Sequence, residues 1–284
     1  MKKKKSLEKL IMTLPVSLWM ILLVAIPFIY VFGISFLEKG TYGGVTLSFT
    51  LENYKGVFNP LYMKVFGESF IIAAVVTVIC VLIAYPFTYF IAQKTTIKKT
   101  VFMAMVTVPF LVPSLIRLFS WTNLLRKNGI INSFLINLGI IKEPLQLVYN
   151  EVGAIIGLIY ILLPFMILPL YSSIDKLNRS YLEASSDLGA KPVTTFMKVT
   201  LPLTMPGIFA GSILVFIPAL GLYYVTDLLG GSKTQLVGNI IKNEFITARN
   251  WPMGAALAIF LVLITLVMVW LYQKSGGDMD ELGV

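Results

Sequence analysis

The sequence predicts an all-α integral membrane protein with six transmembrane helices in a single domain, residues 1–284. Hydrophobic residues make up 57% of the chain and the mean hydropathy is +0.84, which is more apolar surface than a soluble fold can bury. Charged residues make up 13%, where ordinary soluble domains have about 25%. Six stretches have about 20 or more mostly apolar residues, the length that a helix needs to cross a bilayer.

The first of the six stretches follows the lysine run Lys2–Lys5. A signal peptide could begin in the same way, but this stretch is long and no small-residue cleavage site stands near its end. We therefore expect a retained first span. The predicted spans are residues 10–37, 67–92, 101–125, 152–171, 206–229 and 253–272.

The distribution of lysine and arginine predicts the orientation of these spans. Cytoplasmic loops of membrane proteins carry an excess of both residues. With the N-terminal lysines inside, the inside segments hold 13 Lys and Arg residues and the outside segments hold 9. This excess favours cytoplasmic N- and C-termini. It also accounts for the net charge of +9 through membrane orientation and the anionic inner leaflet, so no nucleic-acid partner is expected.

Missing residues and motifs exclude several kinds of chemistry. The chain has no histidine, which removes histidine-based acid–base catalysis, metal sites and proton relays. Its one cysteine, Cys80, stands inside an apolar run, so no disulfide can form within the chain. The sequence has no G-x-x-x-x-G-K-S/T phosphate loop, no serine nucleophile motif and no metal-ligand cluster. We expect a chain that is not an enzyme and that binds no nucleotide, metal or other cofactor itself.

One connection, residues 172–205, is polar without being rich in turn residues. The run Ser180-Tyr181-Leu182-Glu183 has the spacing of a capping box, in which the serine accepts from the glutamate amide and the carboxylate reaches back. We expect a short helix over Tyr181–Leu188, ended by Gly189 in a left-handed turn. A second short helix over Lys191–Thr200 would precede the fifth span. A helix–Gly–helix between two spans suits a docking element.

This connection resembles the signature loop of ABC-importer permeases. That signature reads Glu-Ala-Ala, three residues, Gly, nine residues, Ile, one residue, Leu-Pro. All of its spacings match here, with serine replacing the second alanine and valine replacing the isoleucine. In that family the loop forms a coupling helix that sits in a cleft of the ATPase subunit. The matching residues are Glu183, Ala184, Ser185, Gly189, Val199, Leu201 and Pro202.

Longer runs resemble the spermidine/putrescine branch of the same family, from about residue 100 to the end of the sixth span. These runs are residues 158–165, 169–174, 202–207 and 218–231. The resemblance implies a permease of the MetI-like type, with six helices and a cytoplasmic coupling helix, in the bacterial cytoplasmic (inner) membrane. Its function would be the ATP-driven import of polyamines by alternating access.

The resemblance also implies partners. A second homologous permease, a dimer of ATPase subunits and an extracytoplasmic polyamine-binding protein would complete the assembly, with membrane lipid around it. ATP and Mg²⁺ would bind to the partner ATPase. Within this chain, the residues implied in ATPase coupling are Ser180, Glu183, Ala184, Ser185, Gly189, Leu201 and Pro202. The alternative interpretation of these residues is an ordinary capped loop helix.

Asp227 is the main candidate for contact with a cationic cargo. If the fifth span begins at Pro206 and is straight, Asp227 lies about 32 Å along it, near the outer mouth. Tyr223 and Tyr224 precede Asp227 by four and three residues, so both can share its face. Two ring faces and a carboxylate suit a polyamine, because rings attract ammonium groups and pack against methylene chains. The alternative is an interfacial aromatic belt beside a paired aspartate.

Three further residues are weaker candidates for the pathway. Arg117 would lie about 25 Å along a straight third span, where we expect an ion pair with Asp227 or with a carboxylate of a partner permease, or snorkelling to the interface. Lys242 lies in the loop helix expected within Gln235–Arg249, which lines the gate in the family, although a solvated face would also explain it. Tyr160 is a membrane tyrosine that either packs in the core or lines the pathway.

Two other functions remain open from the sequence. An ABC permease for ferric ion, an aminophosphonate or an oxyanion would share the coupling loop but would not need the Tyr-Tyr-Asp group. A proton-driven secondary transporter or channel would need several buried acids or histidines. Only Asp227 and Arg117 are plausible intramembrane charges here, so this second alternative is weaker.

Overall fold

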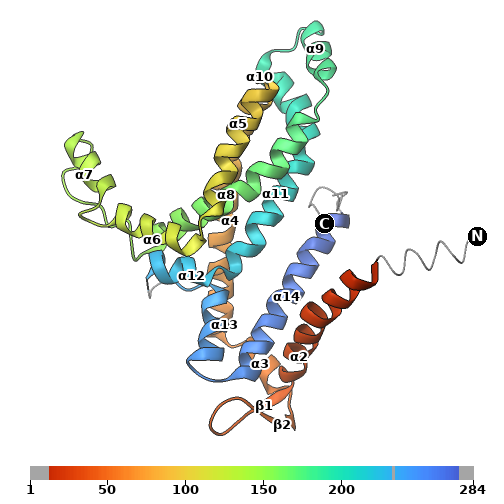
Figure 1. Cartoon of the computed structure of the whole chain (residues 1–284), viewed down its shortest axis with the longest axis vertical. Helices are drawn as coiled ribbons and strands as arrows, with labels where there is room; N and C mark the ends of the chain where they lie inside the picture. Colours follow the sequence, from red (N-terminus) through yellow and green to blue (C-terminus); the bar gives the residue numbers. More distant parts are fainter. Residues whose placement is uncertain (1–12, 232–233, 275–284) are drawn as a thin grey trace, which may run out of the picture. The chain divides into compact units, whose positions relative to one another are not determined.

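The computed structural model describes residues 13–231 and 234–274, and it is predominantly helical (Figure 1). The lysine run Lys2–Lys5 and the first three residues of the predicted first span lie outside the described residues. The chain forms two compact units. Unit 1 comprises the residues up to Met63 together with Ile240–Ile264, and unit 2 comprises Lys64–Asn239 together with the residues from Thr265 onward.

Unit 1 begins with a helix over Thr13–Ile34, which includes the π turn η1 (Ile21–Ala25) and α2 (Ile26–Ile34). It is followed by an antiparallel hairpin and a short helix. The remaining elements of this unit come from α4, α13 and α14, which contribute residues to both units. The bounds are β1 (Leu37–Lys39), β2 (Val45–Phe49), α3 (Glu52–Val57), α4 (Pro60–Ala92), α13 (Val237–Ile246) and α14 (Trp251–Lys274).

The hairpin of unit 1 was not predicted from the sequence, which indicated helix as far as residue 37. Gly43 and Gly44 have positive φ angles of 98° and 76° and make the turn between the strands. The side-chain amide of Asn53 donates to the carbonyl oxygens of Ser35 (3.0 Å) and Leu37 (2.8 Å). The first helix therefore ends at Ile34, because the backbone after it is redirected by these hydrogen bonds.

Unit 2 contains most of α4 and the helices between residues 96 and 230. Several of its helical segments are short. The bounds are α5 (Thr96–Thr107), η2 (Val108–Leu111), α6 (Ser114–Leu125), α7 (Ile130–Asn137), α8 (Glu151–Asp175), α9 (Arg179–Asp187), α10 (Pro192–Thr195), η3 (Phe196–Thr200), α11 (Leu201–Gly221), α12 (Tyr223–Val225) and η4 (Thr226–Gly230). Three of its segments are 3-10 or π turns that directly follow an α-helix: η2 follows α5, η3 follows α10 and η4 follows α12.

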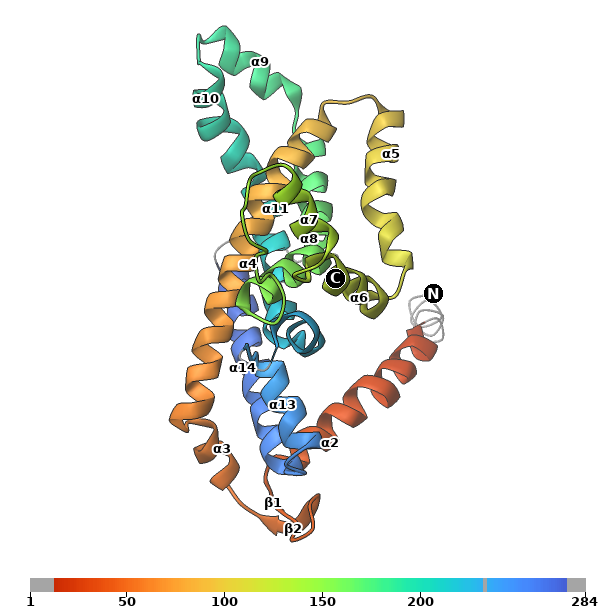
Figure 2. The ribbon, with the colours of Figure 1, turned by 90° about the vertical axis from the view of Figure 1, so that its left-hand side faces the viewer.

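The core of unit 2 is built around α8 and α11, which lie side by side (Figures 1 and 2). Two glycines of α11, four residues apart, permit this approach. A Cβ atom on Gly211 would lie 2.6 Å from the Met166 sulfur, and one on Gly207 would overlap the Ser173 side chain and lie 3.0 Å from the Pro169 carbonyl oxygen. Small residues at four-residue spacing bring membrane helices close enough for backbone packing.

The third predicted span is not one straight helix. Thr96–Leu111 and Ser114–Asn137 are bent by 96° at a short break. Val112 is extended at the break, with φ −87° and ψ 131°, because the residue before a proline, here Pro113, disfavours the helical region. The prediction of a continuous helix over residues 101–125 is therefore wrong, and so is the height of Arg117 calculated from it.

Five described helices are long and apolar enough to cross a membrane, and the bent pair makes up to six. This agrees with the predicted number of spans but corrects several bounds. Helix α4 starts seven residues earlier than expected, and the fifth helix runs without a break over Pro192–Gly221. The five single helices are Thr13–Ile34, Pro60–Ala92, Glu151–Asp175, Pro192–Gly221 and Trp251–Lys274.

Candidate functional site

The predicted coupling loop contains a short exposed helix, α9, between α8 and α10 at one end of unit 2 (Figures 1 and 2). It starts two residues earlier than expected. The side-chain oxygen of Asn178 accepts a hydrogen bond from the Ser180 amide at 3.1 Å. The prediction of a Ser180–Glu183 capping box is therefore wrong. Asparagine is as good an N-cap as serine, and capping at residue 178 places Ser180 inside the first turn.

The end of α9 agrees with the prediction for Gly189. This residue has a φ of +76°. The Gly189 amide donates to the Ser186 carbonyl oxygen at 2.9 Å, and the Ala190 amide donates to the Ser185 carbonyl oxygen at 3.1 Å. These two hydrogen bonds define a Schellman motif, which needs a left-handed residue at its centre. The helix direction at the coupling loop is thus fixed by a glycine.

Ser185 links α9 to the next helix. Its hydroxyl oxygen lies 2.8 Å from the hydroxyl oxygen of Thr195 in α10. Ser185 is buried, whereas Ser180, Glu183 and Ala184 are exposed. The position at which serine replaces the alanine of the family signature is therefore the one that joins the two parts of the loop. The exposed residues are free to meet another surface.

Leu201 and Pro202 lie inside a continuous helix and do not connect two helices as expected. The path runs from α10 through the π turn η3 into α11. The Leu201 amide donates to the carbonyl oxygen of Phe196, five residues earlier. Because a proline provides no amide hydrogen, a wider turn before Pro202 lets the helix continue. The coupling loop therefore continues rigidly into the fifth span.

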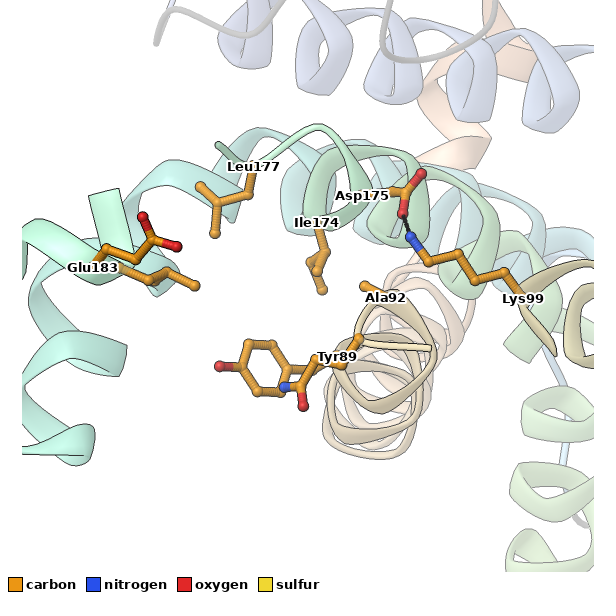
Figure 3. Close-up of a pocket in the computed structure, with 9 residues that line it drawn as sticks. Tyr89, Ala92, Lys99, Ile174, Asp175, Leu177 and Glu183 are labelled. Carbon is orange, nitrogen blue, oxygen red and sulfur yellow. Dashed lines mark hydrogen bonds and ion pairs between the residues drawn. The ribbon is translucent and has the colours of Figure 1, made fainter. Parts of the chain in front are cut away.

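A pocket of about 440 Å³ lies beside α9 (Figure 3). Figure 3 shows the ion pair between Lys99 of α5 and Asp175 of α8 on one side of this pocket and Glu183 on the other. The sequence analysis did not identify Lys99 or Asp175, because their pairing joins residues that are far apart in the chain. The lining residues are Tyr89, Ala92, Gln93, Lys99, Ile174, Asp175, Leu177, Leu182 and Glu183.

Asp227 lies on the chain surface in the π turn η4. The side-chain nitrogen of Asn239 donates to its carboxylate at 2.8 Å. The rings of Tyr223 and Tyr224 are perpendicular, with centroids 6.1 Å apart, and Tyr223 is 40% exposed. Tyr223 and Asp227 lie four residues apart on one short helical segment, α12–η4. The prediction that both residues belong to the same helical segment is therefore confirmed.

That segment is separate from the fifth span. Leu222 leaves the helical region, with φ −73° and ψ 61°, and α11 ends at Gly221 with Pro218 in its last turn. The expectation of a single span over residues 206–229 is wrong. The distance of about 32 Å along that span, calculated for Asp227 on the assumption of a straight helix, is therefore wrong as well. The break lies next to Pro218 and Gly221, two residues that disfavour a continuous helix.

Asn239 is a site residue that sequence reasoning missed. It is 4% exposed. Its side-chain oxygen accepts from the Leu236 amide at 2.9 Å and lies 2.8 Å from the Thr226 hydroxyl, while its nitrogen reaches Asp227. The signal available in the sequence was a polar side chain among the otherwise apolar residues of the first turn of α13. Asn239 positions the Asp227 carboxylate.

Arg117 is 9% exposed and lies between aromatic rings. Its guanidinium carbon is 4.7 Å from the ring centre of Phe110 and 5.5 Å from that of Tyr160. Its Nε atom is buried without a hydrogen-bond partner, and the ion pairs of the described residues do not include it. An ion pair between Arg117 and Asp227 is therefore absent from the described structure. Tyr160 packs against Trp121, with ring centres 5.2 Å apart.

Lys242 belongs to unit 1, on the predicted loop helix, which is observed as α13. Its side chain is half-buried. The neighbouring Glu244 accepts a hydrogen bond from the Tyr62 hydroxyl at 2.9 Å. Within residues 13–231 and 234–274, no group of three or more His, Cys, Asp and Glu residues could hold a metal ion.

Residues 84–276 match the family model described as "Binding-protein-dependent transport system inner membrane component". The chain belongs to this family of ABC-importer permease subunits, which are non-catalytic membrane components. The "Spermidine/putrescine transport system permease protein PotB" of Haemophilus influenzae is 44% identical over 257 residues, 90% of each chain. The protein of the same name from Escherichia coli is 42% identical, over 93% of this chain and 96% of that one.

Other comparisons agree on family and fold. The "Inner membrane ABC transporter permease protein YdcU" of Escherichia coli is 35% identical, over 84% of this chain and 79% of that one. A bacterial alginate ABC transporter solved in complex with a periplasmic protein has a chain that matches with a TM-score of 0.75 and 16% identity, over 94% of this chain and 93% of that one. The MetNI methionine transporter matches with a TM-score of 0.56 and 16% identity, over 76% of this chain and 97% of that one.

Proposed function

We propose that this chain is the permease subunit of an ATP-driven importer that moves polyamines, spermidine or putrescine, into the cytoplasm. The observation that carries the proposal is 42–44% identity to the PotB permeases named above, over at least 90% of the chain. The matched stretch makes up at least 90% of the chain, so the match is not confined to the loop that many ABC permeases share.

The assembly that follows from this proposal has four kinds of subunit. This chain and a second homologous permease form the pathway, two ATPase subunits bind ATP and Mg²⁺ on the cytoplasmic side, and an extracytoplasmic binding protein delivers the cargo. The chain crosses the bacterial inner membrane with both termini in the cytoplasm, surrounded by lipid. It carries no cofactor of its own.

The coupling loop would transmit ATPase motion to the fifth span. Glu183 and Ala184 are exposed on α9, and Gly189 sets the direction in which the chain leaves this helix. The continuous helix from Pro192 to Gly221 then links the loop to the core pair of helices, α8 and α11. A rigid lever of about 45 Å, at 1.5 Å for each of its residues, can carry a rotation across the membrane.

The cargo would meet the α12–η4 segment. The exposed ring of Tyr223 and the exposed carboxylate of Asp227 suit an ammonium group on a methylene chain. Asn239 keeps the carboxylate in place through one of its oxygens. Tyr224 supports the Tyr223 ring. Lys242, Arg117 and Tyr160 would each be further pathway residues.

ATP hydrolysis by the reconstituted complex tests the proposal. The complex contains this chain, the second permease, the ATPase and the binding protein in lipid nanodiscs. We expect spermidine to stimulate hydrolysis only when the binding protein is present. An intact complex that hydrolyses ATP without responding to spermidine or putrescine would overturn the polyamine assignment and leave the importer architecture standing. Ferric ion, aminophosphonates and oxyanions, each with a cognate binding protein, are then the alternatives.

A further inference from the structure

Two adjoining hollows lie at the start of α8, and both are lined by Arg126, Lys127 and Tyr149. Their volumes are about 670 Å³ and about 200 Å³. We call these hollows together the basic pocket. The other lining residues are Asn123 and Asn128 in the larger hollow, and Leu125, Gln146, Leu147 and Val148 in the smaller one.

The two cations of the basic pocket are exposed. The ion pairs found among the described residues, Lys55–Glu52, Lys64–Glu68 and Lys99–Asp175, do not include either of them. The two positive charges are adjacent in the chain and line the same hollows. A group with negative charge would be attracted by both of them.

The backbone beneath the basic pocket is fixed by hydrogen bonds. Asn132 is fully buried, and its side-chain nitrogen donates to the carbonyl oxygens of Arg126 (3.1 Å) and Leu145 (2.9 Å). Its oxygen accepts from the Leu145 amide at 2.8 Å. The Gly129 amide also donates to the Arg126 carbonyl oxygen, at 2.8 Å. The two cations are therefore presented from a rigid turn, which lowers the entropy lost when a partner binds.

Tyr149 supplies a second sign of a functional site. Its φ is +63°, a left-handed conformation that is uncommon for a bulky residue. The strain is maintained by a hydrogen bond of 2.6 Å from its amide to the Leu229 carbonyl oxygen. Strained residues of this kind cluster at binding sites. Here the strained residue lies on the wall that the two cations share.

The basic pocket and the coupling loop lie at opposite ends of α8. Tyr149 precedes Glu151, the first residue of α8, and the loop follows Asp175, the last. A helix of 25 residues is about 37 Å long, more than the roughly 30 Å of a bilayer core. If the coupling loop faces the cytoplasm, the basic pocket faces the outside. A polyamine cation would be repelled there, so the pocket does not suit the cargo.

We propose that the basic pocket is the point at which an acidic surface of the extracytoplasmic binding protein docks on this chain. The proposal rests on the importer function proposed above and names the contact that recruits the loaded binding protein. The alginate transporter with the same fold was solved in complex with its periplasmic protein, so a permease of this shape accommodates such a partner. Arg and Lys side chains bind carboxylates, the groups that an acidic protein surface presents, as well as phosphates.

The test is a titration of the nanodisc complex with spermidine-loaded binding protein, with ATP hydrolysis as the readout. The double variant Arg126→Glu, Lys127→Glu should need about tenfold more binding protein for half-maximal stimulation, because attraction becomes repulsion. Copurification of the variant with the ATPase shows that it still assembles. Added salt should weaken stimulation of the wild type more than that of the variant.

A matched control is Lys142→Glu, an exposed lysine of the same segment that does not line the basic pocket. It should behave as the wild type. An unchanged titration for the double variant, or an equal shift for Lys142→Glu, overturns the docking proposal. If the wild type itself is not stimulated by the spermidine-loaded protein, the importer function proposed above has failed instead.

Nanodisc composition separates a protein partner from a lipid. The shift caused by the double variant should be the same in phosphatidylcholine nanodiscs and in nanodiscs that contain phosphatidylglycerol. If it appears only with the anionic lipid, the basic pocket binds a lipid phosphate, and the docking proposal is overturned.

Discussion

The hydroxyl oxygens of Ser185 and Thr195 lie 2.8 Å apart and join α9 to α10. A hydrogen bond between side chains contributes about 1 kcal/mol to stability. We expect Ser185→Ala and Thr195→Val each to lower the stability of the coupling loop by about that amount, and the double variant to lose little more than either. Thermal unfolding of the three variants measures this. Additive losses would show that the two hydroxyls do not interact.

Gly189 is at a φ of +76°, and apart from its two chain neighbours no described residue has an atom within 4 Å of the position of a Cβ there. The cost of a side chain there is conformational, about 1–2 kcal/mol, and is least for asparagine, which tolerates this region. We expect Gly189→Asn to transport normally. Gly189→Val should misdirect the chain after α9, so that ATP is hydrolysed with less transport per ATP. Equal transport per ATP in both variants would contradict this role.

Some parts of this fold could be predicted from the sequence and others could not. Apolar stretches identify the spans, since their length is set by the bilayer. The glycine at position 189 was predicted because few residues adopt its conformation. The bend at Val112–Pro113 was missed because a hydropathy average runs across a proline. The fusion of α10 with α11 was missed because a π turn before Pro202 has no simple sequence signal.

The polar contacts of the site were the least predictable feature. The Val237 amide donates to the Ser69 hydroxyl at 3.0 Å across 168 residues of sequence. Asn239 reaches Asp227 only because the chain folds back after η4. Such contacts depend on tertiary packing, which spacing along one helix does not specify. The sequence could therefore identify Asp227 but not the amide that positions it.

The Asp227 carboxylate is expected to carry the attraction for the cationic cargo. Asp227→Asn keeps a hydrogen-bonding side chain near Asn239 and removes the charge. We expect polyamine transport to fall about tenfold, equivalent to about 1.4 kcal/mol, with the ATPase still bound. Uptake of radiolabelled spermidine into proteoliposomes measures it. Glu143→Gln, which removes an exposed charge elsewhere, should transport as the wild type. Normal uptake by Asp227→Asn would show that the site assignment is wrong.

Gly211 and Gly67 give a matched pair for the packing of α8 against α11. A Cβ on Gly211 would lie 2.6 Å from the Met166 sulfur, whereas one on Gly67 in α4 would meet no atom of the described residues within 4 Å outside the adjacent backbone of its own helix. We expect Gly211→Ala to destabilise the protein by about 1–3 kcal/mol through overpacking. Gly67→Ala should be neutral or stabilising by up to about 1 kcal/mol, from helix propensity. Thermal unfolding in detergent measures both, and similar unfolding temperatures would contradict the close packing.

Arg117 and Tyr160 test what stabilises a buried cation that forms no ion pair with a carboxylate of the described residues. Cation–π contacts contribute about 0.5–2 kcal/mol each, while burying a guanidinium whose Nε lacks an acceptor is costly. Replacing the charge by an apolar side chain removes both effects, so we expect Arg117→Met to unfold at the wild-type temperature or above it. Tyr160→Leu keeps the charge but removes one ring, together with the contact to Trp121, and should unfold at a lower temperature. If Arg117→Met instead lowers the unfolding temperature more than Tyr160→Leu does, the guanidinium is stabilised by an ion pair and not by the rings.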